Sequence, residues 1–189
     1  MEHININQLS ERNCVICLVD PQPRVVEVTE EGKHLPVIFK KIVEIGRIFK
    51  IPVIVTRQYM KGLGDIDKTV FEGIIEGTKI IDKVEFNCFD NIEFIKHLNT
   101  LNTERKFFIL AGVEAHICIL QTALAAIEQR YNTIVLKDAT SSREEKNCQA
   151  GLDILNTQGA TIMTTEMWAF LLTKRAGTKE FKEILTLFK

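Results

Sequence analysis

The sequence predicts an α/β protein in which a parallel β-sheet lies between helices on both of its faces. The first observation behind this prediction is that short apolar runs alternate along the chain with longer segments of helical period. The second is that the runs at 53–55 and 134–136 are apolar throughout, without the alternation of a half-exposed strand. Continuous apolar runs are typical of strands covered on both faces, as the strands of parallel sheets are.

The predicted strands and helices follow one another as β and α over most of the chain. Strands are expected at 14–19, 52–56, 79–82, 106–111, 133–137 and 160–163. Helices are expected at 35–50, 91–100, 116–130, 144–157, 165–175 and 178–187. Pro52 fits this assignment because a proline is tolerated as the first residue of a strand. Since no repeat, low-complexity tract or linker interrupts these elements, we expect a single domain over 1–189.

The least regular stretch is 57–78, which follows the second strand and holds four of the ten glycines. Long irregular excursions in compact domains are usually functional loops or insertions. Gly62 and Gly64 do not form a dinucleotide-binding fingerprint, because the third glycine is missing and the pair does not open a helix directly. The first strand is followed by Asp-Pro-Gln-Pro instead of a glycine-rich turn, which also disfavours a nucleotide-binding Rossmann protein.

Charge and composition argue against several classes of protein. The chain has 24 Lys+Arg against 25 Asp+Glu, a net charge of -1, and no basic stripe, so we expect no nucleic-acid partner. No apolar run approaches the length of a membrane span, so we expect no membrane partner. The N-terminal residues do not resemble a secretory signal, and the five cysteines are odd in number and scattered. Together these features predict free thiols and a cytoplasmic location.

Cys14 and Cys17 form a Cys-x-x-Cys pair, but both lie within the predicted first strand. Side chains alternate along a strand, so positions three apart face opposite sides of the sheet. The pair is therefore expected to be structural, without a shared metal ion or disulfide.

Three predicted strands end in residues that carry chemistry. The first strand ends at Asp20, the third ends at Lys83, and the fourth continues through a turn into the segment 112–118, which finishes at Cys118. In open parallel sheets ligands bind beyond the carboxyl ends of the strands. We therefore expect the carboxylate, the ammonium and the thiol to approach one another.

These three groups suit nucleophilic attack on a carbonyl carbon. Cys118 is expected in the first turn of a helix, where the helix dipole favours a thiolate. Asp20 can take the thiol proton and return it to a leaving group, while Lys83 favours the thiolate. The alternatives are that Cys118 is a small buried apolar residue and that Asp20 and Lys83 form an ordinary ion pair.

At these residues the sequence resembles the isochorismatase-like cysteine hydrolases, especially the branch of isochorismatase domain-containing proteins. The resemblance extends from about Asn13 to the C-terminus. It is carried by Asp20 with Gln22 two residues on, by Lys83, and by the segments 56–64, 111–118, 138–143, 164–166 and 181–184.

The resemblance implies a three-layer α/β/α fold with a six-stranded, Rossmann-like parallel sheet and a catalytic triad of Asp20, Lys83 and Cys118. It also implies a cis peptide bond between Val113 and Glu114, with the backbone N–H groups of Glu114 and Cys118 forming an oxyanion hole. Relatives that cleave the vinyl ether of isochorismate lack the nucleophilic cysteine, so Cys118 favours amide hydrolysis. Relatives assemble as homo-oligomers, and we expect a dimer or a tetramer.

The residues expected around the substrate are Gln22, Tyr59, Phe86 and Ala115. Tyr59 and Phe86 are candidate pocket walls because small-molecule sites are mostly apolar, and Ala115 stands where the family commonly has Thr. The segment 56–59 has no histidine, unlike the metal cluster of nicotinamidases, so we expect no metal ion and no other cofactor. His116 is expected to be structural, because residues two apart on a helix do not face each other.

The sequence thus predicts a cytoplasmic cysteine hydrolase that cleaves a small-molecule amide through a covalent intermediate on Cys118. The competing prediction is a catalytically silent protein of the same fold that binds small molecules or serves assembly.

Overall fold

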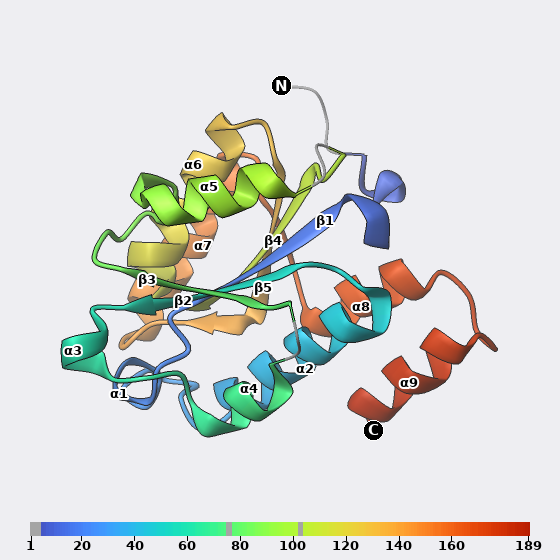
Figure 1. Ribbon diagram of the computed structural model, residues 1–189, viewed down its shortest axis with the longest axis horizontal. Coiled ribbons are helices and arrows are strands. Elements are labelled where there is room, and N and C mark those ends of the chain that lie inside the picture. The colour runs from blue at the N-terminus through green and yellow to red at the C-terminus, as the bar shows by residue number, and fades with distance from the viewer. Residues whose placement is uncertain (1–4, 75–76, 102–103) are drawn as a thin grey trace.

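The computed structural model describes residues 5–74, 77–101 and 104–189, and Figure 1 shows one sheet with helices on both sides. The strands are β1 (Cys14–Val19), β2 (Val53–Gln58), β3 (Lys79–Lys83), β4 (Phe107–Val113), β5 (Asn132–Ser141) and β6 (Thr161–Met163). They lie in the order β3-β2-β1-β4-β5-β6, and every neighbouring pair is parallel. The predicted α/β fold with a six-stranded parallel sheet is confirmed.

Helices cover the sheet on both faces (Figure 1). The helices are α1 (Pro23–Val26), α2 (Leu35–Phe49), α3 (Met60–Leu63), α4 (Lys68–Gly73), α5 (Ile92–Thr100), α6 (Leu120–Glu128), α7 (Glu145–Thr157), α8 (Thr165–Thr173) and α9 (Lys179–Leu187). Single turns are η1 (Ile6–Gln8), η2 (Glu11–Asn13), η3 (Cys88–Asp90) and the π-helix η4 (Ala115–Ile119). Helices α2, α8 and α9 pack on one face, and α5, α6 and α7 pack on the other. Among the described residues, no helix is long and apolar enough to cross a bilayer.

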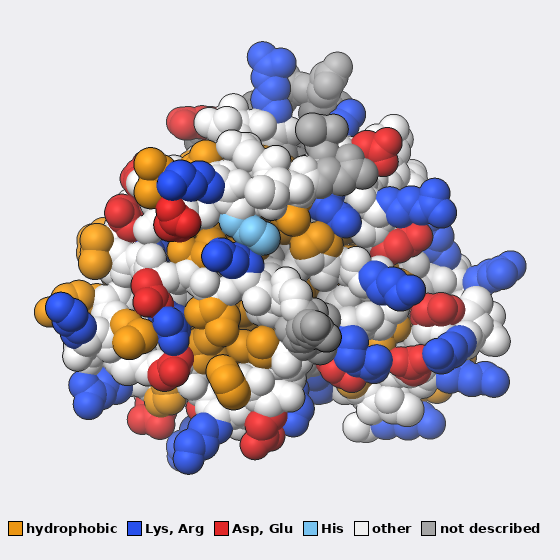
Figure 2. Space-filling view, viewed as in Figure 1, with side chains coloured by type: hydrophobic (Ala, Val, Ile, Leu, Met, Phe, Trp, Pro, Cys, Tyr) orange, Lys and Arg blue, Asp and Glu red, His pale blue; other side chains and the backbone are white. Residues whose placement is uncertain are grey.

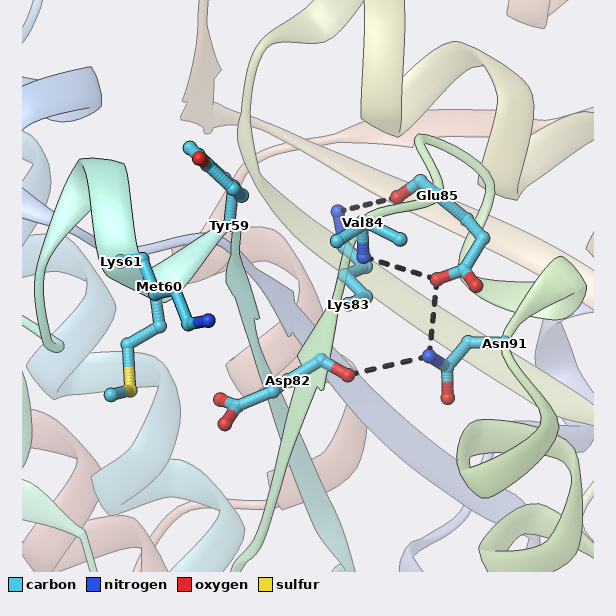
Figure 3. Close-up of a pocket in the computed structure, with 8 residues that line it drawn as sticks. All are labelled: Tyr59, Met60, Lys61, Asp82, Lys83, Val84, Glu85 and Asn91. Atoms are coloured by element: carbon cyan, nitrogen blue, oxygen red, sulfur yellow. Dashed lines mark hydrogen bonds between the residues drawn. The ribbon is translucent and has the colours of Figure 1, made fainter.

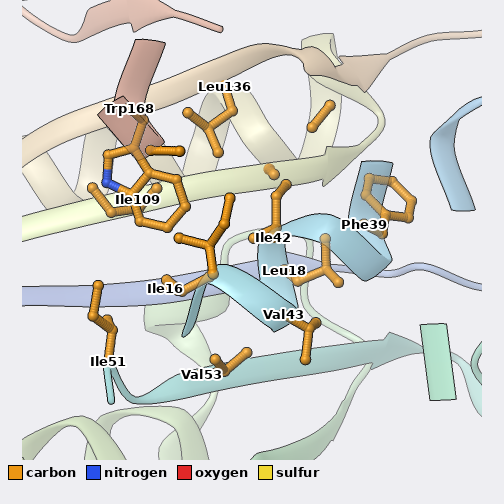
Figure 4. Packing of buried hydrophobic residues seen from close by; sticks show 14 of the residues in the cluster. Ile16, Leu18, Phe39, Ile42, Val43, Ile51, Val53, Ile109, Leu136 and Trp168 are labelled. Atoms are coloured by element: carbon orange, nitrogen blue, oxygen red, sulfur yellow. The ribbon is translucent and has the colours of Figure 1, made fainter. Parts of the chain in front are cut away.

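Alternate residues of each central strand enter two separate hydrophobic clusters. In β1, Ile16 and Leu18 point into the hydrophobic cluster formed with α2 and α8. Trp168 of α8 belongs to the same cluster (Figure 4). Val15 and Val19 face the other cluster. Cys14 belongs to the first cluster and Cys17 to the second, so the prediction that they face opposite sides is confirmed, and both thiols are free.

The stretch 57–78 is more regular than predicted. β2 extends to Gln58, and two short helices, α3 and α4, follow it. Helices of one or two turns are too short to show a helical period, so their signals are local. One such signal is Asp67, whose carboxylate accepts a hydrogen bond from Thr69 N at the start of α4.

The helix predicted at 116–130 also differs in its first turn. The segment from Ala115 to Ile119 is a π-helix, and α6 begins at Leu120. The carbonyl of Glu114 accepts hydrogen bonds from Ile117 N and Ile119 N, which widens this turn. Cys118 therefore lies in a π turn instead of a regular first turn of an α-helix.

The strand order determines which side chains can meet at the carboxyl edge of the sheet. β1 lies between β2 and β4, and β3 is the edge strand beyond β2. The chain therefore changes direction across the sheet between β1 and β4, which is where ligands bind in open α/β sheets. Asp20 follows β1 directly, whereas Lys83 at the end of β3 must reach past the end of β2.

Gly112 allows β1 and β4 to approach closely beside this point. It has φ +126°, and a Cβ added there would lie 2.0 Å from the carbonyl oxygen of Val19. We expect Gly112→Ala to lower the free energy of unfolding by more than about 4 kcal/mol, because backbone strain and a backbone clash combine. The matched control is Gly177→Ala: Gly177 also has positive φ but no neighbour within 4 Å of an added Cβ. This control should cost only about 1–2 kcal/mol.

Urea unfolding of the two variants beside the wild type measures both differences. Equal destabilisation by the two substitutions would show that the close approach to β1 contributes nothing.

Candidate active site

Asp20 is held rigidly at the carboxyl end of β1. Its backbone is left-handed, with φ +53°, and its N–H donates to the carbonyl and the hydroxyl oxygens of Thr56. The Thr56 hydroxyl donates to Asp20 Oδ1 at 2.7 Å, and Lys83 Nζ donates to Asp20 Oδ2 at 2.7 Å. Asp20 is 1% exposed, so these bonds replace the water that a carboxylate would otherwise need.

Lys83 is a buried ammonium with three oxygen acceptors. Besides Asp20, it donates to Gln58 Oε1 at 2.5 Å and to the carbonyl of Glu85 at 3.2 Å. An ammonium has three N–H groups, so each of them has an oxygen partner. Burial by itself would lower the pKa of Lys83, but the charge of Asp20 and the nearby Cys88 and Cys118 outweigh it and raise that pKa. The upward shift favours the cationic form of Lys83.

Cys118 lies beside this ion pair. Its side chain comes from the π turn η4 and is nearly buried, and Sγ is 3.8 Å from Lys83 Nζ. Burial, followed by the charge of Asp20, raises the pKa of Cys118 to about 12, although Lys83 opposes this shift. The resting form is therefore the neutral thiol. This differs from the expectation that the helix dipole and Lys83 would hold a thiolate.

Glu114 joins the end of β4 to the π turn η4 that carries Cys118. The peptide bond between Val113 and Glu114 is cis. The carboxylate of Glu114 is buried and accepts a hydrogen bond from Arg143 Nε at 2.8 Å, and Arg143 N donates to it at 3.2 Å. Glu114 thereby links this turn to the residues that follow β5.

Gln22 and Gln58 join the loops after β1 and β2. Gln22 Oε1 accepts from Gln58 N at 2.7 Å, and Gln22 Nε2 donates to the carbonyls of Gln58 and Gly64 at 3.0 and 2.6 Å. The Gln58 amide in turn donates to Val84 O at 2.9 Å while its oxygen accepts from Lys83. Gln22 is fully buried, and its hydrogen bonds tie the loop after β1 to the end of β2 and to Gly64.

A pocket of about 410 Å³ opens beside Lys83 (Figure 3). It is lined by Tyr59, Met60, Lys61, Asp82, Lys83, Val84, Glu85 and Asn91. This volume is in the range of small-molecule sites. Lys83 belongs to this lining, but its side chain has no exposed surface, and Asp20 and Cys118 are not among the lining residues.

The four residues predicted around the substrate take different places. Tyr59 lines the pocket described above. Gln22 and Ala115 are completely buried, because the Gln22 amide bonds backbone carbonyls and Ala115 packs against Gly151 of α7. Phe86 is exposed but lies outside the lining of this pocket. Gln22, Phe86 and Ala115 are not among the lining residues of this cavity, and their place around the substrate stays a prediction.

His116 is not paired with Cys118. Its Nδ1 lies 2.9 Å from the hydroxyl of Ser142, which agrees with the structural role expected for it. Across residues 5–74, 77–101 and 104–189, no cluster of three His, Cys, Asp or Glu side chains is placed to hold a metal ion.

The sequence reasoning missed Thr56 and Gln58, both of which contact the Asp20–Lys83 pair. A signal was present, since both are polar and lie near the carboxyl end of a buried strand.

Comparison with known proteins identifies the relatives of this chain. The family model described as the isochorismatase domain matches residues 14–167. Isochorismatase family protein 1A of Dictyostelium discoideum is 35% identical over 150 residues, which is 78% of this chain and 72% of that protein.

Solved structures show the same fold. The MAR1 ribonuclease of Caenorhabditis elegans superposes with a TM-score of 0.88 at 30% identity, covering 95% of this chain and 91% of that one. YcaC of Escherichia coli, described as an octameric hydrolase of unknown specificity, superposes with a TM-score of 0.86 at 24% identity, covering 95% and 88%.

The contacts of Gln58 generate a prediction about the thiol. Gln58→Met removes the closest acceptor of Lys83 and frees one N–H group 3.8 Å from Cys118 Sγ. The freed donor favours the thiolate, so we expect the pKa of Cys118 to fall and its alkylation by iodoacetamide at neutral pH to become roughly tenfold faster. Mass spectrometry of the peptide that contains Cys118 measures the rate. Gln158→Met, at an exposed glutamine after α7, is the matched control.

A rate for Gln58→Met equal to or below that of the wild type would show that Gln58 does not keep Lys83 away from the thiol.

Proposed function

This chain belongs to the isochorismatase family, a family of hydrolases, and from that premise we propose that it hydrolyses small-molecule amides with Cys118 as the nucleophile. The observation that carries this proposal is the buried contact of three groups: the Cys118 thiol, the Lys83 ammonium and the Asp20 carboxylate. Each belongs to a different segment at the carboxyl edge of the sheet, and together they supply a nucleophile, a base and a fixed cation.

In the first half of the reaction, the Cys118 sulfur attacks the amide carbon while Asp20 accepts the thiol proton. A neutral thiol suits this step, because the proton then leaves as the carbon–sulfur bond forms. The tetrahedral intermediate collapses with loss of the amine, which takes the proton back from Asp20. A thioester on Cys118 remains.

In the second half, Asp20 accepts a proton from water as the water oxygen attacks the thioester carbon. Collapse of this intermediate returns the proton to the Cys118 sulfur and releases the carboxylic acid. The sum is one amide plus one water giving one acid plus one amine. Lys83 serves throughout by holding the Asp20 carboxyl group in position, and we propose the backbone N–H groups of Glu114 and Cys118 as the oxyanion hole.

The alternative is a catalytically silent protein of the same fold. One observation favours it: Cys118 is only 6% exposed and does not line the pocket, and the Lys83 side chain has no exposed surface. A substrate must therefore displace the wall beside Lys83, or reach the sulfur by another path, before attack.

We also propose that the protein forms a homo-oligomer and works in the cytoplasm. The octameric state described for YcaC suggests assembly, and large apolar side chains such as Val84, Phe86 and Ile92 are exposed near the pocket. Figure 2 shows hydrophobic side chains among charged ones on the face that carries the edge strand β3.

Light scattering tests the proposed assembly by measuring the mass of the protein in solution. We expect a multiple of the mass of one chain, whereas the mass of one chain would contradict this proposal.

The amidase proposal is tested with a panel of small primary amides by measuring ammonia release. We expect Cys118→Ala to abolish release and Asp20→Asn to lower it at least about a hundredfold, because general acid–base catalysis is lost.

Whereas ammonia release should fall in Asp20→Asn, the rate at which iodoacetamide alkylates Cys118 should rise in the same variant. The charge of Asp20 helps to raise the thiol pKa, so its removal lowers that pKa and speeds alkylation. Asp153→Asn, at an exposed site on α7, is the matched control.

Ammonia release that survives in Cys118→Ala would eliminate the thioester mechanism. Binding of amides without release in the wild type would support the silent alternative. RNA belongs in the same panel because the C. elegans neighbour is called a ribonuclease, and we expect no cleavage of it.

A further inference from the structure

One wall of the pocket is formed by three consecutive residues, Tyr59, Met60 and Lys61, which we call the α3 wall. Figure 3 shows this wall opposite Val84, Glu85 and Asn91, with Lys83 between the two sides. Tyr59 and Met60 expose 56% and 43% of their surface, so the wall presents apolar area to the pocket. Such area is favourable for binding the carbon skeleton of a small ligand.

The α3 wall is fixed to the catalytic residues at its first residue. Tyr59 N donates to the carbonyl of Lys83 at 2.8 Å. The backbone of Tyr59 is left-handed, with φ +36°, a conformation that costs about 1–2 kcal/mol for a residue other than glycine. The ring of Tyr59 lies on Gly62, where an added Cβ would be 2.6 Å from it. Backbone strain that the surroundings maintain is typical of functional sites.

The residues that follow the α3 wall are anchored to the chain after β1, at Gln22 and at Arg24 of α1. Arg24 Nη1 donates to the carbonyl of Gly62 at 2.6 Å, and Gln22 Nε2 donates to that of Gly64 at 2.6 Å. With both ends bonded, the three side chains of the wall start from a fixed backbone, as a specificity surface requires.

The charged groups of the pocket differ in whether they have partners. Asp82 accepts from Arg57 Nε at 2.6 Å, and Glu85 accepts from Asn91 Nδ2 and from Val84 N. Lys83 is paired with Asp20. Among the described residues, the ammonium of Lys61 has no hydrogen-bond or ion-pair partner. It is therefore the cation in this lining that remains available to a ligand, whereas Glu85 on the opposite side keeps a negative charge because its partners Val84 and Asn91 are neutral.

We propose that Lys61 binds an anionic group at the end of the substrate that is remote from the bond to be cleaved, so that the preferred substrates are small amides bearing a carboxylate. The amide carbon would lie toward Lys83 and Cys118, the carbon skeleton along Tyr59 and Met60, and the carboxylate at Lys61. This inference rests on the proposed function for the position of the amide, but the charge preference is a property of the pocket and holds with or without turnover.

The test is protection of Cys118 from iodoacetamide by paired compounds. Succinamate and its longer homologue glutaramate carry an amide and a carboxylate, while butyramide and valeramide are the neutral counterparts. In the wild type we expect the acids to protect at about fivefold lower concentration than the neutral amides, the upper end for a solvent-accessible ion pair. Lys61→Met should abolish this preference, and Lys61→Glu should reverse it. Lys68→Met makes the same change at an exposed lysine of α4 outside the pocket lining and should preserve it.

A preference for the acids that survives in Lys61→Met would overturn the assignment of Lys61. Equal protection by acids and neutral amides in the wild type, or no protection by either, would overturn the substrate class. Ammonia release from the same compounds is recorded in parallel. Protection that depends on Lys61 without any release would retain the charge preference while refuting the amidase, so the two failures are distinguishable.

Discussion

The arrangement of the whole site depends on one buried ion pair, between Asp20 and Lys83. Both charges are removed from water, and a buried pair is tolerated only when its remaining donors and acceptors are satisfied. Thr56, Gln58 and the carbonyl of Glu85 meet that requirement. Because these partners come from β2 and from the chain after β3, the pair couples the ends of β1, β2 and β3 into one rigid unit.

The same pair determines the state of the nucleophile. Asp20 and burial favour the neutral Cys118 thiol, and the three N–H groups of Lys83 all have oxygen partners. The site is therefore organised to move a proton during the reaction instead of storing a thiolate beforehand. A neutral thiol is also less easily oxidised or alkylated, since both reactions require the thiolate.

The fold could be predicted from the sequence because its signals are local. Apolar runs marked the buried strands, and helical periods marked α2, α5 and α7 to within a residue or two. The approach of Asp20, Lys83 and Cys118 followed from their positions at strand ends. The contacts of Gln58 could not be predicted in this way, because they depend on β2 lying between β1 and β3. The π turn at Cys118 and the burial of Gln22 likewise arise from packing between segments distant in sequence.

The measurement that tests the neutral thiol most directly is the ultraviolet absorbance of thiolates, recorded against pH for the wild type and for Cys118→Ser. The difference between the two proteins isolates Cys118 from the other cysteines. With a pKa raised to about 12, Cys118 should show no titration step below about pH 10. A step with its midpoint near or below about pH 7.5 would show that Lys83 prevails over burial and Asp20. The resting site would then hold a thiolate, contrary to the mechanism proposed for it.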